Sequence, residues 1–325
     1  MAYVVEPDRV LERSYCHSVM NFPRLLVPVK GPFREEKIQG AVEGMGSYGD
    51  ATRTLVAAGF VQPDLITGMT LALISNQPRK PRPDGERKAS GTAGKIWVRE
   101  RYTIHRPLAV DDEWEVTGES TGTYARKGRS YSTTRSISLN SAGECFATNL
   151  TTGLFSYRPD RSLSDSDEGL AIGDTLAPEP DWEAARRNPH AGLLTVAKVG
   201  QVLGGVEVPM TLAMMAARDT DNPDNPIHSD PEEAKKAGLG RPIAGGSHVA
   251  AFALEAVMQE FGIESLLHGA NFDFRWKAPT EDGTRIMATA TVTATKSNRV
   301  AFDLRVDLVD GPTAMVGTLV IPLPQ

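Results

Sequence analysis

The sequence predicts an α+β fold made of two similar units, each a long helix packed against an antiparallel β-sheet. Three observations carry this prediction: an apolar helical segment in each half of the chain, a block of strands after each helix, and a polar stretch between the halves. The 325 residues are 40% hydrophobic and 23% charged, which is typical of a globular protein with a substantial core.

One helical segment opens each unit. In the first half, residues 63–68 lead into an apolar run at residues 69–74; in the second, residues 242–246 lead into a segment that ends at residue 261. The apolar residues of the second segment fall near helical spacing: Val249, Phe252, Ala253, Val257 and Phe261.

The strand blocks are recognised by β-rich, alternating residues separated by turn residues such as Lys127-Gly128 and Asp282-Gly283. Strands are expected at residues 95–105, 113–123, 129–139 and 145–156, and then at 285–295, 302–308 and 312–323. We therefore expect a first unit at residues 1–160, a linker rich in Ser, Asp, Pro and Glu at 161–190, and a second unit at 191–325. The alternative is a coincidence of ordinary α+β patterning.

Composition excludes several functional classes. A net charge of −6 argues against a nucleic-acid partner. Cys16 and Cys145 are too few and too separated for a disulfide framework or a cysteine zinc site, which suits the reducing cytoplasm. Neither a signal peptide nor an apolar window long enough for a membrane helix is visible, so we expect a cytoplasmic protein without a membrane partner.

The one dense basic segment, residues 79–82 with Arg87 and Lys88, has two interpretations. It is a solvated loop, which is the more common role of such a run, or a clamp for the phosphates of a nucleotide-containing ligand.

The first candidate for chemistry is His228, in the proline-stiffened segment Asn225-Pro226-Ile227-His228. Histidine titrates in the range that acid–base catalysis needs, and a nearby carboxylate can orient it. Three carboxylates precede it: Asp219, Asp221 and Asp224. The alternative role of this acidic cluster is capping and turn formation, which we expect of Asp230 because a proline and two glutamates follow it.

The second candidate is Gly245-Gly246-Ser247, where glycines precede the second helical segment. Free amides at a helix start can polarise a carbonyl and form an oxyanion hole, or the glycines can simply make a tight turn. We expect His248 to be a helix residue with a local partner. His17, His105, His190 and His268 have no ligand spacing, so no metal site is predicted.

These segments resemble a known family. Residues 224–230, then Ala234, Gly238 and residues 241–246, are similar to the MaoC-like, (R)-specific enoyl-CoA hydratases, and residues 274–279 look like that family's first strand after the helix. The resemblance implies a tandem, double hot-dog fold. In it a degenerate N-terminal repeat shapes the acyl pocket and the C-terminal repeat carries the catalytic loop.

The resemblance also implies a hydro-lyase of fatty acid metabolism that needs no cofactor or metal. It would interconvert a trans-2-enoyl-CoA and an (R)-3-hydroxyacyl-CoA, with His228 and an Asp sharing one water, Asn225 fixing the loop, and the Gly246 amide holding the thioester oxygen. Pro223 stands where the family has its Asp, so Asp219, Asp221 and Asp224 remain alternative partners. Gly245 stands where the family usually has histidine.

Two other functions remain open. A non-catalytic acyl-CoA-binding protein would keep the fold without the family's Asp, and a hot-dog thioesterase would direct water at the carbonyl carbon. The oligomeric state is open too, because two fused repeats can already form the pair that single-repeat relatives make from two chains. A homodimer is compatible with the same pattern.

Overall fold

The computed structural model describes residues 4–5, 24–75, 96–154, 164–165, 180–219 and 226–325. Within these residues a single antiparallel sheet has the strand order β1-β2-β4-β5-β6-β3-β8-β11-β10-β9-β7. The first-half strands are β1 Val4–Val5, β2 Arg24–Pro32, β3 Ile96–Ile104, β4 Glu113–Arg126, β5 Arg129–Asn140 and β6 Cys145–Leu154. The second-half strands are β7 Val202–Pro209, β8 Ala270–Trp276, β9 Arg285–Lys296, β10 Arg299–Leu308 and β11 Thr313–Pro322.

The strand order is mirrored about the centre of the sheet. From one side the order is β2-β4-β5-β6-β3, and from the other it is β7-β9-β10-β11-β8, so the two halves meet where β3 pairs with β8. At this junction Arg99 on β3 makes a two-pronged ion pair with Asp273 on β8, at 2.9 and 2.7 Å. The predicted strands of both halves are confirmed.

The hairpin between β4 and β5 shows why the sequence turns where it does. Lys127 and Gly128 both have positive φ, 50° and 69°, and two such residues in succession match the right-handed twist of paired strands. Here the predicted turn is confirmed.

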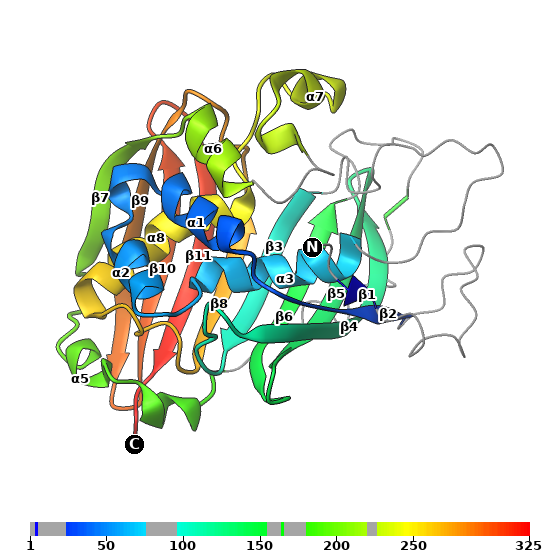
Figure 1. Ribbon diagram of the computed structural model, residues 1–325. Helices are drawn as coiled ribbons and strands as arrows, with labels where there is room; N and C mark the ends of the chain where they lie inside the picture. Colours follow the sequence, from blue (N-terminus) through cyan, green and yellow to red (C-terminus); the bar gives the residue numbers. More distant parts are fainter. Residues whose placement is uncertain (1–3, 6–23, 76–95, 155–163, 166–179, 220–225) are drawn as a thin grey trace.

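Helices cover one face of the sheet (Figure 1). Helix α3, Pro63–Ser75, contacts strands β2 to β6, and helix α8, Gly246–Phe261, contacts β7, β9 and β10. The other helices are α1 Glu35–Gly44, α2 Asp50–Ala57, α5 Ala191–Leu194, α6 Leu212–Arg218 and α7 Pro231–Lys236, with short 3₁₀ turns η2 Gly46–Tyr48, η3 Ala184–Arg187 and η4 Pro226–His228. Among the described helices, none is long and apolar enough to cross a membrane.

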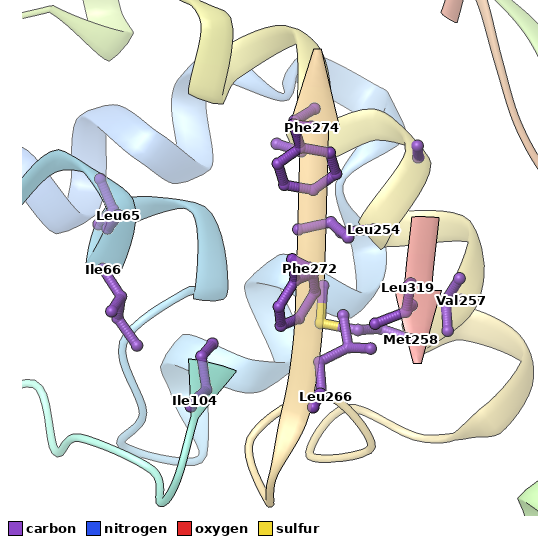
Figure 2. Close-up of a cluster of buried hydrophobic side chains, with 14 of the residues drawn as sticks. Leu65, Ile66, Ile104, Leu254, Val257, Met258, Leu266, Phe272, Phe274 and Leu319 are labelled. Atoms are coloured by element: carbon purple, nitrogen blue, oxygen red, sulfur yellow. The ribbon is translucent and has the colours of Figure 1, made fainter. Parts of the chain in front are cut away.

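The core is continuous across the two halves. Figure 2 shows Leu254 of α8 with Phe272 and Phe274 of β8, and Leu65 and Ile66 of α3 to one side of them in the same buried cluster. All five side chains are at most 3% exposed. The halves therefore fold around one shared core, because α3 and α8 pack against each other and the buried residues of both halves form one cluster.

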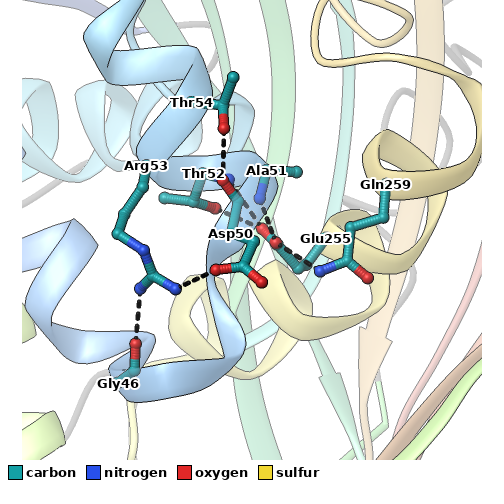
Figure 3. Close-up of polar contacts among 8 residues, drawn as sticks. All are labelled: Gly46, Asp50, Ala51, Thr52, Arg53, Thr54, Glu255 and Gln259. Carbon is teal, nitrogen blue, oxygen red and sulfur yellow. Dashed lines mark hydrogen bonds and ion pairs between the residues drawn. The ribbon is translucent and has the colours of Figure 1, made fainter.

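A buried carboxylate from the second half caps a helix of the first (Figure 3). Glu255 on α8 accepts hydrogen bonds from the backbone N–H groups of Ala51 and Thr52, at 2.6 and 3.0 Å, and from the Thr52 hydroxyl at 2.7 Å. Helix α2 begins after Gly49, which has no side chain to cap it. Glu255 therefore supplies, across 204 residues of sequence, the acceptor that its first turn needs.

We expect Glu255→Ala to lower the free energy of unfolding by about 1–3 kcal/mol, because it leaves buried N–H donors of α2 without an acceptor. Urea denaturation would measure this. The matched control is Glu260→Ala, five residues further along α8, where the carboxylate is exposed and accepts a hydrogen bond from Gln201 at 2.8 Å. A similar small loss in both variants would contradict the capping role.

Candidate active site

His228 ends the short turn η4 and is half-buried. Its Nδ1 lies 2.6 Å from the carbonyl oxygen of Ile243. A carbonyl can only accept, so Nδ1 carries the hydrogen in the neutral ring, and Nε2 is the nitrogen that can accept a proton. The fold thereby selects the tautomer that a general base requires.

The segment around His228 is held by its backbone at both ends. The Ile243 N–H donates to the Ile227 carbonyl at 3.3 Å, and the Ala244 N–H donates to the Thr280 carbonyl at 2.8 Å. Asp230 caps helix α7, its Oδ1 accepting from the N–H groups of Glu232 and Glu233. The predicted structural role of Asp230 is confirmed.

Gly245 and Gly246 form the start of helix α8. Gly245 is the N-cap, with an extended backbone and no side-chain cap, and the first helical bond runs from the Val249 N–H to the Gly245 carbonyl at 3.1 Å. The N–H groups of Gly246, Ser247 and His248 therefore precede the helical hydrogen-bond ladder, at the positive end of the helix dipole. An oxyanion placed there would be stabilised.

The two glycines serve different purposes. A Cβ on Gly246 would lie 2.6 Å from Cε2 of Trp276, whose Nε1–H donates to the Gly246 carbonyl at 3.0 Å. A Cβ on Gly245 would meet nothing within 4 Å. Gly246 is therefore fixed by the close approach of an indole ring, whereas Gly245 leaves open space where the family resemblance implies a histidine.

Asp219 directly follows helix α6, and its backbone N–H bonds the Met215 carbonyl at 3.1 Å. Its neighbour Arg218 makes a buried ion pair with Asp64 at the start of α3. Asp219 is thus held by a helix end that is anchored to the first half. Asp221, Asp224 and Asn225, the other predicted loop residues, lie outside the described residues, as does the basic segment at residues 79–88.

The partner of His248 is not local, so that expectation was wrong. Its Nε2–H donates to the carbonyl of Gly44, 204 residues away, at 2.8 Å, and the ring is fully buried. Burial, with smaller contributions from the charges of Arg218 and His228, lowers the pKa of His248 to about 3. A neutral His248 therefore joins the start of α8 to the end of α1.

The arrangement brings together two of the predicted groups: a histidine whose tautomer is set, and the free amides of a helix start. Through Ile243, the histidine bonds to the segment that immediately precedes Gly245. Among the described residues, no group of three or more His, Cys, Asp or Glu side chains could hold a metal ion.

The segment that holds the candidate site is similar to a known domain family. Residues 197–307 match the family model described as a MaoC-like domain. This match includes His228, Gly245 and Gly246. A search of curated proteins finds no significant sequence match.

Solved structures share the fold at low sequence identity. One called a MaoC-like dehydratase has a TM-score of 0.66 at 19% identity, over 90% of this chain and 95% of its own. The full-length peroxisomal multifunctional enzyme type 2 from Drosophila melanogaster gives 0.61 at 15%, over 92% of this chain and 48% of its own. A conserved hypothetical protein from Mycobacterium tuberculosis, described as having a double hot-dog fold, gives 0.58 at 15%, over 90% and 94%.

A structure from Lactobacillus plantarum described as a putative oleoyl thioesterase also shares the fold, with a TM-score of 0.54 at 9% identity, over 94% of this chain and 98% of its own. Neighbours with different named activities share one architecture. The fold alone therefore does not choose between hydration and hydrolysis.

Gly246→Ala should lower the free energy of unfolding by about 1–3 kcal/mol, because the added methyl group overlaps the Trp276 indole. Gly245→Ala is the matched control. Its backbone already has φ −62° and ψ 147°, which any residue adopts, and the added Cβ has space. Thermal unfolding of both variants would measure the difference, and equal melting temperatures would contradict the assigned roles.

The low pKa of His248 makes stability depend on pH. Between 6.5 and about 3 the unfolded chain binds a proton that the folded chain excludes, so stability falls as the pH is lowered through this window, by up to about 1.4 kcal/mol per pH unit. His248→Gln should flatten this slope, whereas Ser247→Ala, a neighbouring substitution that removes no titratable group, should not. Urea unfolding at several pH values within the window measures the slopes, and unchanged steepness in His248→Gln would refute the assignment.

Proposed function

We propose that this chain, which contains a MaoC-like domain at residues 197–307, is a hydro-lyase that interconverts a trans-2-enoyl-CoA and an (R)-3-hydroxyacyl-CoA. The observation that carries the proposal is the hydrogen bond from His228 Nδ1 to the Ile243 carbonyl. It sets Nε2 as the base and ties the histidine to the segment that leads into the free amides of α8.

In the hydration direction, the amide N–H of Gly246 binds the thioester oxygen and draws electrons away from the double bond. Water then attacks the β-carbon: a C–O bond forms, the π electrons move to the thioester oxygen as an enolate, and His228 Nε2 takes the water's proton. The enolate electrons then re-form the thioester carbonyl as the α-carbon takes up a proton, which His228 Nε2 returns directly or through its carboxylate partner, so that one water is added and the base is regenerated. A histidine–carboxylate pair of this kind contributes about 10²–10⁴-fold.

The carboxylate partner comes from the segment just before His228. Asp219 is the candidate whose backbone is described, and its place at the anchored end of α6 gives it a fixed position. Asp221 and Asp224 are the alternatives. Asn225 has the proposed role of holding the loop, and Ser247 adds a second helix-start amide next to Gly246.

The mirrored strand order supports a tandem arrangement of two hot-dog repeats. We place the first at residues 1–160 and the second at 191–325, with residues 161–190 between them. Near the end of that connection, Asp181 bonds the ring of His105 at 3.1 Å and its N–H donates to the Gly269 carbonyl at 3.1 Å, so the connection contacts both halves. The cytoplasm remains the proposed compartment and a homodimer the proposed assembly to test.

A thioesterase is the second candidate, because the fold neighbour described as a putative oleoyl thioesterase shares the architecture. Hydrolysis sends water to the carbonyl carbon and releases a thiol, whereas hydration leaves the thioester intact. The third candidate, an acyl-CoA-binding protein without turnover, would change neither signal.

The test is to mix the protein with crotonyl-CoA and with a longer trans-2-enoyl-CoA, and to follow the enoyl absorbance and free thiol together. We expect the absorbance to fall without thiol release, and His228→Ala to lower kcat by about 10²–10⁴-fold with an unchanged unfolding midpoint. Ser229→Ala, the next position in the same loop, is the control and should keep its activity. Thiol release would favour the thioesterase, and full activity of His228→Ala would overturn the mechanism.

The same assay identifies the carboxylate. Asp219→Asn, Asp221→Asn and Asp224→Asn are compared one at a time, and a single large loss marks the partner of His228. Three small losses would mean that no one carboxylate shares the water with the histidine.

A further inference from the structure

The two halves of the sheet differ in the face that lies under the helices. In the second half this face is apolar: Phe302, Leu304 and Val306 of β10 are at most 1% exposed, and Phe302 contacts Phe261 of α8 at a ring distance of 5.7 Å. In the first half, Thr70 of α3 hydrogen-bonds Ser136 of β5 at 2.7 Å, which identifies the equivalent face.

The alternation of side chains along each strand and the pairing between strands show which other residues lie on the face under α3. Ser136 lies opposite Asn149 of β6, and Asn149 lies opposite Tyr102 of β3. The polar side chains on this face, all at most 6% exposed, are Thr134, Ser136, Ser138, Asn149, Thr151 and Glu100. Small hydroxyl side chains therefore stand under α3 where Phe, Leu and Val stand under α8, and they fill less volume.

At the centre of this polar face is a hydrogen-bonded cluster. Glu100 Oε1 accepts from Asn149 Nδ2 at 2.8 Å, and the Thr151 hydroxyl lies 3.0 Å from Asn149 Oδ1. Tyr102, two residues beyond Glu100 on the same face, is fully buried, and its hydroxyl has no hydrogen-bond partner among the described residues. Burial, reinforced by the charge of Glu100, raises the pKa of Tyr102, so the hydroxyl stays neutral and can donate.

Buried hydroxyl groups are nearly always hydrogen-bonded in folded proteins, and one without a partner calls for an explanation. A ligand group that bonds to it is such an explanation.

A chain of aromatic rings connects this cluster to the proposed oxyanion site. Tyr102 stacks on Phe272 at 4.3 Å and lies 5.8 Å from Phe274; Phe274 lies 6.1 Å from Trp276, which bonds the Gly246 carbonyl. Glu100 on β3 is paired with Phe274, which lies two residues before Trp276 on β8. The Cα atoms of Trp276 and Glu100 are therefore about 8 Å apart. A medium-length acyl chain whose thioester is bound at Gly246 therefore spans the distance to the cluster.

We propose that the substrate's acyl chain carries a hydroxyl group, which Tyr102, Glu100 and Asn149 recognise on the inner face of the first half. This inference rests on the proposed function, because it takes the thioester to be bound at Gly246. A hydroxyl fits because it both donates and accepts. An alkyl chain would leave the Tyr102 hydroxyl unsatisfied.

The test measures binding rather than turnover. Saturated acyl-CoAs from hexanoyl to decanoyl, and their ω-hydroxy counterparts, are titrated into the full-length protein by calorimetry. At the best chain length we expect the hydroxylated ligand to bind about tenfold more tightly, as one buried hydrogen bond provides. Equal affinities at every length would overturn the inference.

Tyr102→Phe should abolish most of the preference for the hydroxylated ligand. The affinity for the plain acyl-CoA should not fall, and the unfolding midpoint should not fall either. Tyr131→Phe is the matched control: this residue stacks on Tyr124 and lies on the opposite face of β5, so its loss should keep the preference. Glu100→Gln, which keeps the size and shape of the side chain, is a second variant in case Tyr102→Phe does not fold.

The binding readout separates the two proposals. Absence of hydration with a preserved hydroxyl preference refutes the proposed reaction and keeps the recognition site. Hydration without any hydroxyl preference refutes this inference alone. A preference that survives in both Tyr102→Phe and Glu100→Gln would also overturn it, because the hydroxyl would then be recognised elsewhere.

Discussion

The buried ion pair between Arg218 and Asp64 is the contact on which the candidate site depends. Two charges removed from water are stable together only because each compensates the other, and loss of either partner of such a pair typically costs about 3–5 kcal/mol. The pair joins the end of α6 to the start of α3. It therefore fixes Asp219, the next residue, relative to the first half. Helix α1 also packs closely against Arg218, since a Cβ on Gly44 would lie 3.1 Å from the Cβ of Arg218.

Burial, and after it the charge of Arg218, lowers the pKa of the neighbouring His248. His248 is buried close to Arg218 and stays neutral, which allows its Nε2–H to donate to Gly44. His228 uses the opposite nitrogen, because its Nδ1–H donates to Ile243. The two histidines therefore use different nitrogens for their structural hydrogen bonds: His228 uses Nδ1, which leaves Nε2 as the nitrogen that can accept a proton, whereas His248 uses Nε2.

The sequence correctly predicted the features that are determined by residues close together in the chain. The strands, the turn at Lys127-Gly128 and the cap at Asp230 each depend on a few neighbouring residues, and the sequence identifies them. The contacts of His248 with Gly44 and of Glu255 with α2 each span about 200 residues, and nothing in their own surroundings reveals them. The role of Gly246 is similar, since its need for glycine comes from Trp276, 30 residues away. The predicted loop is described only from Pro226 onward, so which Asp assists His228 stays a prediction.

The polar inner face explains why the second half supplies so many of the contacts that hold the first. Serine and threonine side chains under α3 bury less apolar area than the Phe, Leu and Val side chains under α8, and therefore contribute less hydrophobic stabilisation. Three connections offset this difference: Glu255 caps α2, His248 binds the end of α1, and Arg218 pairs with the start of α3. Because these supports come from α6 and α8, which also position the candidate catalytic groups, the first half can keep hydrogen-bonding side chains in its interior. Under the proposed function, its inner face would discriminate between acyl chains, while the second half would hold the thioester in a constant position.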